Sequence, residues 1–436
     1  MEQKHCSLEF SVKQVSSHFG YATITVPEQY VNLLYTQASH AQQSGMHTNG
    51  FIKGATPLDY IKQNFQPHLL EHIKEFFFKY FVINWLYQEL QSHKLLIAGD
   101  PRLTDISVHP NQDALYSFSL TLSQPISLQG WKRLPFRAPK RKNYKDLDKQ
   151  VKNFLKDEIK ASKDYNDSVI ALNDWICFSV CILDSEKKEL FNEYSEKLWV
   201  KIGAEEADSP LQKMFIGKKI KESFITDNKF LQDYFSSHID AHYNFKITIL
   251  DVAPHAFFNF NHFKKHFRIR NNQELHLKLI EVFSYRNDMS QRRTTAEDTL
   301  KLLLSRHTID VPNHLILRQQ KSILDDIHSN PDYQVYKMQN DFHDKVRLLA
   351  VKQVKEIILM HQLACYENIT VNDEDIKGYL NLTKRPRTQE FIYFEPPMTK
   401  FLGQEAPLSA ALIAQCCLRE KTLNHAIYYL TKQKAY

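Results

Sequence analysis

Two histidines and a glutamate in one short stretch form the clearest pattern for catalytic chemistry. His68, Glu71 and His72 match H-x-x-E-H, a motif in which two imidazoles one helical turn apart bind zinc beside a glutamate. Two more histidine pairs have the same spacing: His238 with His242, and His262 with His266. Chance gives such pairs in a chain with 20 histidines, and no third ligand stands out among the many acidic residues. A metallohydrolase is therefore the alternative, and we expect an ordinary helix after Pro67 and no bound metal.

The ten glycines exclude most nucleotide-dependent chemistry. The sequence contains no G-x-G, no P-loop and no G-x-S-x-G elbow, so it lacks the backbone turns that hold phosphates or a strained serine nucleophile. We therefore expect no nucleotide and no other cofactor.

Composition indicates a globular protein of several domains. The chain has 436 residues, of which 43% are hydrophobic, and a net charge of +6 from 56 basic and 50 acidic side chains. Such a weak positive charge limits any contact with nucleic acid to local patches. The longest apolar stretch, residues 76–87, contains Lys79 and is shorter than the roughly 20 residues of a membrane span. The charged start resembles no export signal, and we expect no membrane contact and a cytoplasmic location.

Basic residues cluster between residues 132 and 149, where eight cations face only two acids. They are Lys132, Arg133, Arg137, Lys140, Arg141, Lys142, Lys145 and Lys149, against Asp146 and Asp148. Such a cluster favours phosphate contact. The alternative is a solvated strand and helix that connect two domains.

The first 129 residues have the pattern of a small α+β domain. Alternating apolar positions predict strands over residues 8–13 and 21–26. Helices are predicted from Pro27 to about Gln43, and from Pro67 to about Ser92 with a wide apolar side that includes 84–87. A closing strand is predicted over 116–122.

The rest of the chain changes character twice. We predict a basic linker and connecting helix over 130–163, a β-rich unit over 164–252 with strands at 175–183 and 245–250, and a helical body over 253–436. In that body, Val346, Leu349 and Ile358 are among the residues on one apolar face of a helix near 342–361, and Glu356 lies elsewhere. A last helix is predicted from Ser409, its cap, to about Thr431. Many apolar helix faces without a nucleotide site favour an interaction scaffold over an enzyme core.

One loop links this order of parts to a known family. Gly50, Phe51, Ile52, Lys53, Gly54, Ala55, Thr56 and Pro57 stand between two helices of the first domain. The succession resembles bacterial trigger factor, a ribosome-associated chaperone whose loop at this place reads G-F-R-x-G-K-x-P. Gly, Phe, Gly and Pro match, whereas Ile52 replaces the arginine and Ala55 the second lysine. Residues 367–376, with a helix capped by Asn372, look like the joint between helices in the arm region of that family.

The resemblance also implies an altered isomerase pocket. The family has an FKBP-like prolyl isomerase domain in the middle of the chain, and the positions of its pocket residues fall here on Phe178, Ser179, Asp208 and Leu211. These replace the aromatic floor that favours the twisted prolyl amide. We expect this unit to fold without strong isomerase activity, and we assign no catalytic residue.

The resemblance implies a multidomain α+β fold and a chaperone function. Its parts are an N-terminal ribosome-binding domain, an inserted degenerate FKBP-like domain and a C-terminal all-α body with arms. The expected partners are the ribosome, through Gly50, Phe51, Ile52, Lys53, Gly54 and Pro57, and unfolded or nascent polypeptides. Without ATP, such a protein keeps emerging chains open for folding or export. The alternatives are an active prolyl isomerase and an RNA-binding assembly factor without chaperone activity.

Overall fold

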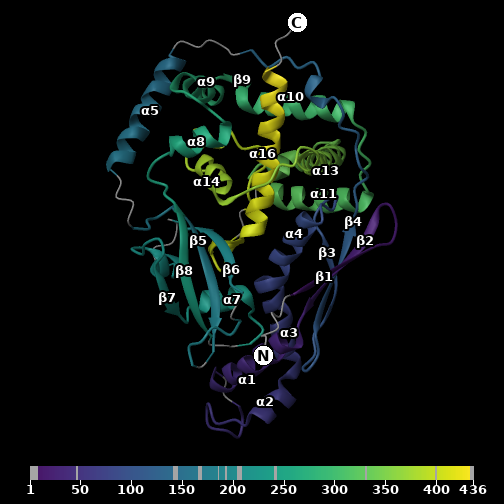
Figure 1. Ribbon diagram of the computed structural model, residues 1–436, viewed down its shortest axis with the longest axis vertical. Coiled ribbons are helices and arrows are strands. Elements are labelled where there is room, and N and C mark those ends of the chain that lie inside the picture. The colour runs from purple at the N-terminus through teal and green to yellow at the C-terminus, as the bar shows by residue number, and fades with distance from the viewer. Residues whose placement is uncertain are drawn as a thin grey trace, which may run out of the picture.

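The chain is elongated, with helices at both ends and two sheets beside the long axis (Figure 1). This computed structural model describes residues 8–45, 48–140, 146–164, 169–184, 186–191, 194–203, 209–239, 243–328, 331–397 and 400–432. The expected fold class is confirmed, because the chain combines several sheets with a helical C-terminal body. No helix in these ranges has the length and apolar character needed to cross a membrane.

The N-terminal unit is a four-stranded antiparallel sheet with helices inserted between its strands. The strand order is β1-β2-β4-β3, in which β1 (Glu9–Gln14), β2 (Phe19–Val26) and β4 (Ala114–Thr121) were expected. Strand β3 (Arg102–Ser107) was not, because its burial pattern hardly alternates. On β4 the buried residues alternate with partly exposed ones, which fixes one face of the sheet to the core.

The helices of this unit extend from the sheet to one end of the molecule. They are α1 (Glu28–Gly45), α2 (Leu58–Asn64), α3 (Gln66–Phe77), the π-helical turn η1 (Phe78–Val82) and α4 (Ile83–Ser92). The single helix predicted from Pro67 to Ser92 is therefore interrupted by η1. A π-helical turn adds one residue to a helical turn, and here three consecutive residues, Tyr80, Phe81 and Val82, are all buried.

The middle sheet has five antiparallel strands, and its edge comes from the far end of the chain. Its order is β13-β6-β5-β8-β7. The strands are β5 (Trp175–Leu183), β6 (Glu196–Lys201), β7 (Ser223–Thr226), β8 (Asn244–Ala253) and β13 (Leu408–Ser409), with α6 (Pro210–Phe215) and α7 (Lys229–Phe235) between them. Leu408 pairs with Trp199 on β6. Residues 169–253 therefore do not complete the sheet alone.

The helical body surrounds α16 (Ala410–Lys432), which contacts α4, α10, α13, α14 and β6 (Figure 1). The linker contributes the short helix η2 (Trp131–Arg133) and α5 (Leu147–Asp164). The other helices are α8 (Phe260–Phe267), α9 (Asn272–Phe283), α10 (Gln291–Arg306), α11 (Asn313–His328), α12 (Tyr333–Lys337), α13 (Phe342–Tyr366), α14 (Asp373–Leu382) and α15 (Pro386–Gln389). Two short hairpins complete it: β9 (Tyr285–Arg286) with β10 (Met289–Ser290), and β11 (Lys400–Phe401) with β12 (Gln404–Glu405).

Two of the predicted caps are confirmed. The Asn372 side chain accepts from the backbone N–H of Asp375, whose carboxylate accepts from the backbone N–H of Asn372, a capping box at the start of α14. Ser409 Oγ accepts from Ala411 N at 3.2 Å, as expected for the start of α16.

The predicted apolar face of α13 is wrong at two positions. Glu356, expected on the polar side, is buried, and its carboxylate accepts a hydrogen bond from Tyr393 Oη at 3.0 Å. Burial raises its pKa to about 7. Leu349, expected on the buried side, is exposed. The periodicity failed because Tyr393, on a distant loop, supplies the partner that Glu356 needs.

One continuous core joins the N-terminal unit to the middle sheet. The ring centroid of Phe76 on α3 lies 5.2 Å from that of Phe235 on α7, and the ring centroid of Phe81 lies 5.0 Å from that of Phe191. Tyr80 Oη donates to the carbonyl oxygens of Val180 and Tyr194 at 3.0 and 3.1 Å. The two units are therefore packed as one body.

Tyr80→Phe tests this joint. Removing the hydroxyl leaves two buried carbonyl groups without that donor, so the free energy of unfolding should fall by about 1–2 kcal/mol. Urea unfolding of the full chain measures the change, and Tyr21→Phe, at an exposed position, is the matched control. Equal stability of the two variants would contradict a structural role for the Tyr80 hydroxyl.

Candidate functional site

The loop over residues 48–57 is exposed at the end of the molecule formed by α1 and α2 (Figure 1). Gly50 and Gly54 have φ of +89° and +81°, values that side chains other than glycine rarely adopt. Two backbone hydrogen bonds between residues three positions apart, Phe51 N to Thr48 O and Ala55 N to Ile52 O, close its turns. Thr56 is buried, and its carbonyl oxygen accepts from Gln43 on α1, so the loop has a fixed base.

The side chains of this loop form an apolar tip with one cation. Ile52 is 81% exposed, and Phe51 is partly exposed with its ring 5.2 Å from that of Tyr60. Lys53 and Pro57 are exposed as well. The structure thus brings together all six residues of the expected contact, in a shape suited to inserting an aromatic anchor into a partner surface.

The expected isomerase pocket is not an open aromatic cleft. Phe178 is fully buried against Phe215, with ring centroids 4.9 Å apart, and Leu211 is buried in the same core. Ser179 follows Phe178 on β5 and therefore points to the opposite face. Asp208 lies outside the described residues. The backbone N–H of Leu211 donates to Gln404 Oε1 at 3.2 Å, so β12 lies against the start of α6.

A second chain segment covers this region. Phe401 on β11 packs against Phe230, and Tyr234 Oη donates to the carbonyl oxygen of Pro407 at 3.1 Å. The cavity beside Leu211, of about 280 Å³, is lined largely by polar residues. Its lining includes Asn173, Lys201, Ser209, Gln212, Gln404 and Glu405. None of the described residues that line this cavity is aromatic.

The two histidines of the zinc-like motif lie in different surroundings. His68 is exposed, whereas His72 is buried, with Nε2 2.7 Å from Tyr243 Oη. Burial lowers the pKa of His72 to about 3, so the ring is neutral and packs in the core. His262 lies near Glu374, and His266 contacts Asn424; His242 lies outside the described residues. No cluster of three potential metal ligands occurs in the described ranges.

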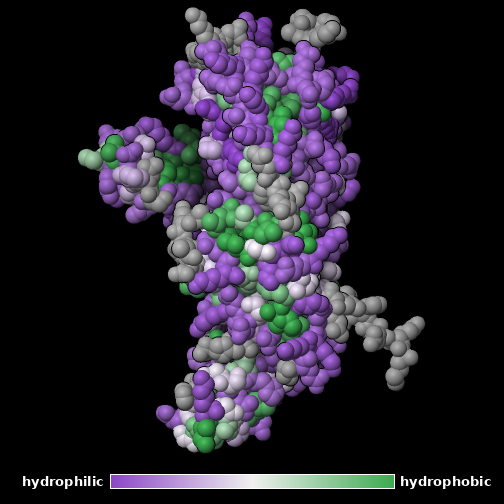
Figure 2. Space-filling model, turned by 90° about the vertical axis from the view of Figure 1, so that its left-hand side faces the viewer, coloured by the Kyte–Doolittle hydropathy of each residue, from purple (hydrophilic) through white to green (hydrophobic). Residues whose placement is uncertain are grey.

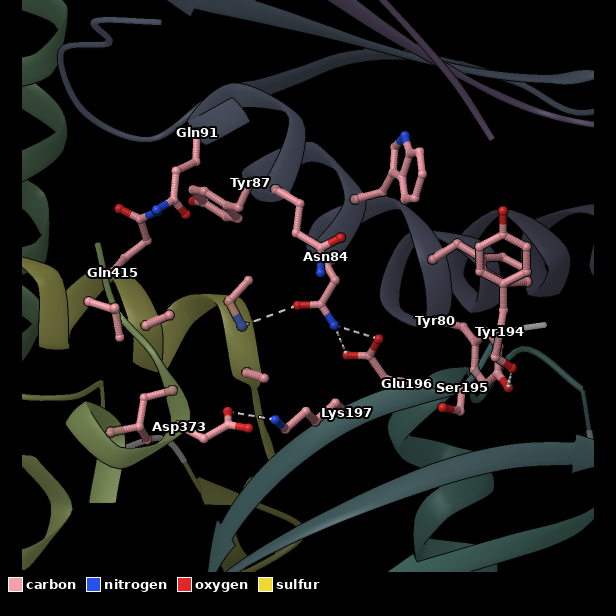
Figure 3. A pocket seen from close by; sticks show the side chains of 18 of the residues that line it. Tyr80, Asn84, Tyr87, Gln91, Tyr194, Ser195, Glu196, Lys197, Asp373 and Gln415 are labelled. Carbon is pink, nitrogen blue, oxygen red and sulfur yellow. Dashed lines mark hydrogen bonds and ion pairs between the residues drawn. The ribbon is translucent and has the colours of Figure 1, made fainter. Parts of the chain in front are cut away.

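A polar junction that the sequence did not reveal connects all three units (Figure 3). Asn84 Nδ2 on α4 donates to both carboxylate oxygens of Glu196 on β6, each at 2.6 Å. Asn84 Oδ1 accepts from Ser409 Oγ and from the backbone N–H of Ala411 at 3.2 Å. The sequence analysis placed Asn84 on the apolar side of its helix. A single amide among apolar residues was the one sequence signal that could have indicated a buried polar contact there.

The junction forms one wall of a pocket of about 330 Å³ between α4, β6, α14 and α16. Figure 3 shows the ion pair at its rim, Lys197 Nζ to Asp373 Oδ1 at 2.8 Å. Burial raises the pKa of Glu196 well above its ordinary value, and the Asn84 amide opposes that shift only in part. The arrangement can hold an uncharged carboxyl group and fix three units relative to one another. It does not have the geometry of a catalytic nucleophile hydrogen-bonded to a general base.

The comparisons with known proteins point to one family. Sequence profiles of bacterial trigger factor protein match residues 8–157, and those of its C-terminus match residues 273–392. A solved structure of the trigger factor chaperone, from work on promiscuous substrate recognition in folding and assembly activities, is 14% identical. It covers 96% of this chain and 99% of its own, with a TM-score of 0.36, a level that does not define a common arrangement. Comparison with curated proteins gives no significant match.

The buried carboxyl of Glu196 predicts a specific pH dependence. The pKa of Glu196 is higher in the folded protein than in the unfolded chain. Its contribution to the free energy of unfolding is therefore fully present at a pH below the unfolded-state pKa, and it is lost as the pH rises through the folded-state pKa. The free energy of unfolding of the parent, relative to Glu196→Gln, should therefore fall with pH, by up to about 1.4 kcal/mol per pH unit. Urea unfolding between about pH 5 and pH 9 measures the difference. A constant difference would contradict the uncharged carboxyl.

Proposed function

The chain belongs to the bacterial trigger factor family, and from this premise we propose that it is an ATP-independent chaperone that binds newly made polypeptides near the ribosome exit tunnel. It keeps these chains open for folding or export. Family membership supports the chaperone role directly. The contact with the ribosome, the nascent state of the client and a cytoplasmic location are our proposals, and they rest on the two surfaces described next.

The observation that carries the client-binding proposal is an exposed apolar surface on the arm, which we define as α11, α12 and the first half of α13. The arm has a small core of its own that includes Ile323, Phe342 and Val346. Around this core, large apolar side chains face solvent: Leu317, Val335, Tyr336, Met338, Leu348 and Leu349. Met338 is 84% exposed and Leu348 is 69% exposed.

The arm projects from the body, and apolar residues are visible on it at the upper left of Figure 2. Contiguous exposed apolar groups mark binding surfaces for other apolar chains. An unfolded polypeptide exposes such groups until it folds, and it gains about 25 cal/mol for each Å² of apolar area buried on contact. Because no directional contact is required, the surface suits clients of many sequences.

The ribosome contact rests on the loop over residues 48–57. It presents Phe51 and Ile52 beside Lys53 at one end of the molecule, where no other part of the described chain obstructs an approaching surface (Figure 1). Apolar and aromatic side chains give the affinity, and Lys53 meets acidic protein or RNA phosphate. With Ile52 in place of the family's arginine, we expect weaker docking than with a full motif.

We propose that the middle unit contributes support and little prolyl isomerase activity. Phe178 and Leu211 belong to its core, and the segment around Phe401, Gln404 and Pro407 covers α6 and α7. A peptide assay of cis-to-trans conversion decides between this and the alternative of an active isomerase. Acceleration equal to that of an intact family member would overturn the proposal.

The arm surface should be needed for holding unfolded clients. Val335→Ser, Met338→Ser and Leu348→Ser together should weaken suppression of the aggregation of a denatured client several-fold, because they remove exposed apolar area. Light scattering at a fixed ratio of chaperone to client measures the effect. Val15→Ser, Ile225→Ser and Leu250→Ser, exposed apolar positions outside the arm, form the matched control. If both triple variants lose the same activity, the arm is not the client surface.

The loop should set ribosome affinity in both directions. Phe51→Ala with Lys53→Ala should weaken co-sedimentation with ribosomes by about tenfold, since the anchor and the loop's cation are lost. Ile52→Arg should strengthen it by adding a second phosphate contact. Tyr21→Ala with Lys13→Ala removes an exposed aromatic and a lysine from paired strands elsewhere and should change nothing. Unchanged binding of the loop variants would exclude this contact.

A further inference from the structure

A large cleft with basic walls lies between α8, α9 and α16, far from the loop over residues 48–57 (Figure 1). Its volume is about 590 Å³. Six cationic side chains and three carboxylates line it, and we call it the basic cleft. The cations are Lys265, Arg268, Arg270, Lys278, Lys421 and Lys432, and the carboxylates are Glu274, Glu281 and Asp375.

The carboxylates of the cleft are already engaged. Glu281 pairs with Lys278 at 2.9 Å and Asp375 with Lys421 at 2.7 Å. Glu274 accepts from the backbone N–H of Arg270 at 2.8 Å, as part of the start of α9. Lys265 pairs with Glu374 just outside the cleft.

Among the described residues, three cations of the cleft have no carboxylate partner. Within the described part of the chain, Arg268, Arg270 and Lys432 form no ion pair. Their charge is thus available to an external anion.

Two of these cations lie over one aromatic ring, and the charge of the third, Arg270, acts on its phenol group. The Arg268 guanidinium lies 5.9 Å from the centroid of Tyr428, and Lys432 Nζ lies 4.1 Å from it. Hydrogen bonding from Lys432, with the nearby charges of Arg270 and Arg268, lowers the pKa of the Tyr428 phenol. Cations arranged around a partly exposed ring are the combination that binds single-stranded nucleic acid, in which phosphates meet charges and bases stack on aromatic rings.

The basic linker extends the same surface. Ala138 lines the cleft, and Gln291 Nε2 donates to the carbonyl oxygen of Pro139 at 3.2 Å, so the linker is held at the rim. Arg137 and Lys140 on either side are exposed. Arg141, Lys142 and Lys145 lie outside the described residues.

A further charge lies behind the wall of the cleft. Arg292 is 1% exposed, with its guanidinium 5.8 Å from the ring of Phe267 and an N–H donated to Asn424, both of which line the cleft. Its carboxylate partner is Glu420, whose Oε1 lies 3.3 Å from Arg292 Nη2. Among the described residues, the Nε and Nη1 groups of Arg292 have no hydrogen-bond partner, so its charge adds to the positive potential of this wall from behind.

We propose that the basic cleft binds single-stranded RNA, with phosphates on Arg268, Arg270 and Lys432 and a base against Tyr428. The volume of the cleft accommodates about one nucleotide and its phosphates, while the linker cations continue the path of the strand. This site is separate from the client surface of the arm and from the loop over residues 48–57.

Fluorescence anisotropy of a labelled oligouridine of about 12 nucleotides, with the full chain, tests the proposal. Arg268→Glu with Arg270→Glu should weaken binding at least about tenfold, and should reduce the slope of log affinity against log salt by about 1.4, or 0.7 per lost phosphate contact. Lys301→Glu with Lys321→Glu, at exposed positions away from the cleft, changes the net charge equally and should leave binding intact. If the first variant does not fold, Lys432→Glu in the last turn of α16 takes its place.

Further binding measurements separate RNA from other anions. Tyr428→Ala should weaken oligouridine binding but not tripolyphosphate binding, because only the nucleic acid stacks on the ring. Poly-glutamate should compete poorly. Failure of the parent to bind oligouridine, equal loss in the charge-matched control, or equally strong competition by poly-glutamate would each overturn the assignment.

Discussion

The amide of Asn84 on α4 satisfies polar groups from two distant parts of the chain, and the arrangement of the three units depends on it. It donates to Glu196 on the middle sheet and accepts from Ser409 and Ala411 at the start of α16. A buried polar group that loses its partner costs about 1–3 kcal/mol, so displacing one element leaves the others unsatisfied. The surrounding aromatic packing favours close contact in many orientations, whereas this amide favours one.

The middle sheet is therefore an internal support. Its Phe178 face shares a core with α3 and η1, and its Trp175 face packs with α14 and α16. Both faces are committed to holding the N-terminal unit and the body together. A sheet used in this way has little apolar surface left for a substrate cleft.

The sequence predicted elements whose periodicity was local and missed contacts between distant segments. Strands β1, β2 and β4, the capped start of α14 and the fold class were predictable, because alternation and capping residues lie within a few positions of each other. The place of β13 was not, since Leu408 and Ser409 carry no strand pattern and pair only because α16 brings them to β6. Glu356 was misjudged, and the partners of Asn84 were missed, for the same reason. Their partners, Tyr393 and Glu196, are remote in sequence, and polarity alone does not reveal burial.

The late origin of strand β13 has a consequence for the synthesis of this protein. Translation produces β5 to β8 long before residues 408 and 409, so the backbone of β6 remains an open sheet edge while the helical body is still being made. Open edges invite pairing with other chains. Glu196 lies at the start of β6, and a charged side chain on an edge strand discourages such pairing. In the complete chain Leu408 and Ser409 occupy this edge, so the sheet gains its last strand only when the start of α16 has been made.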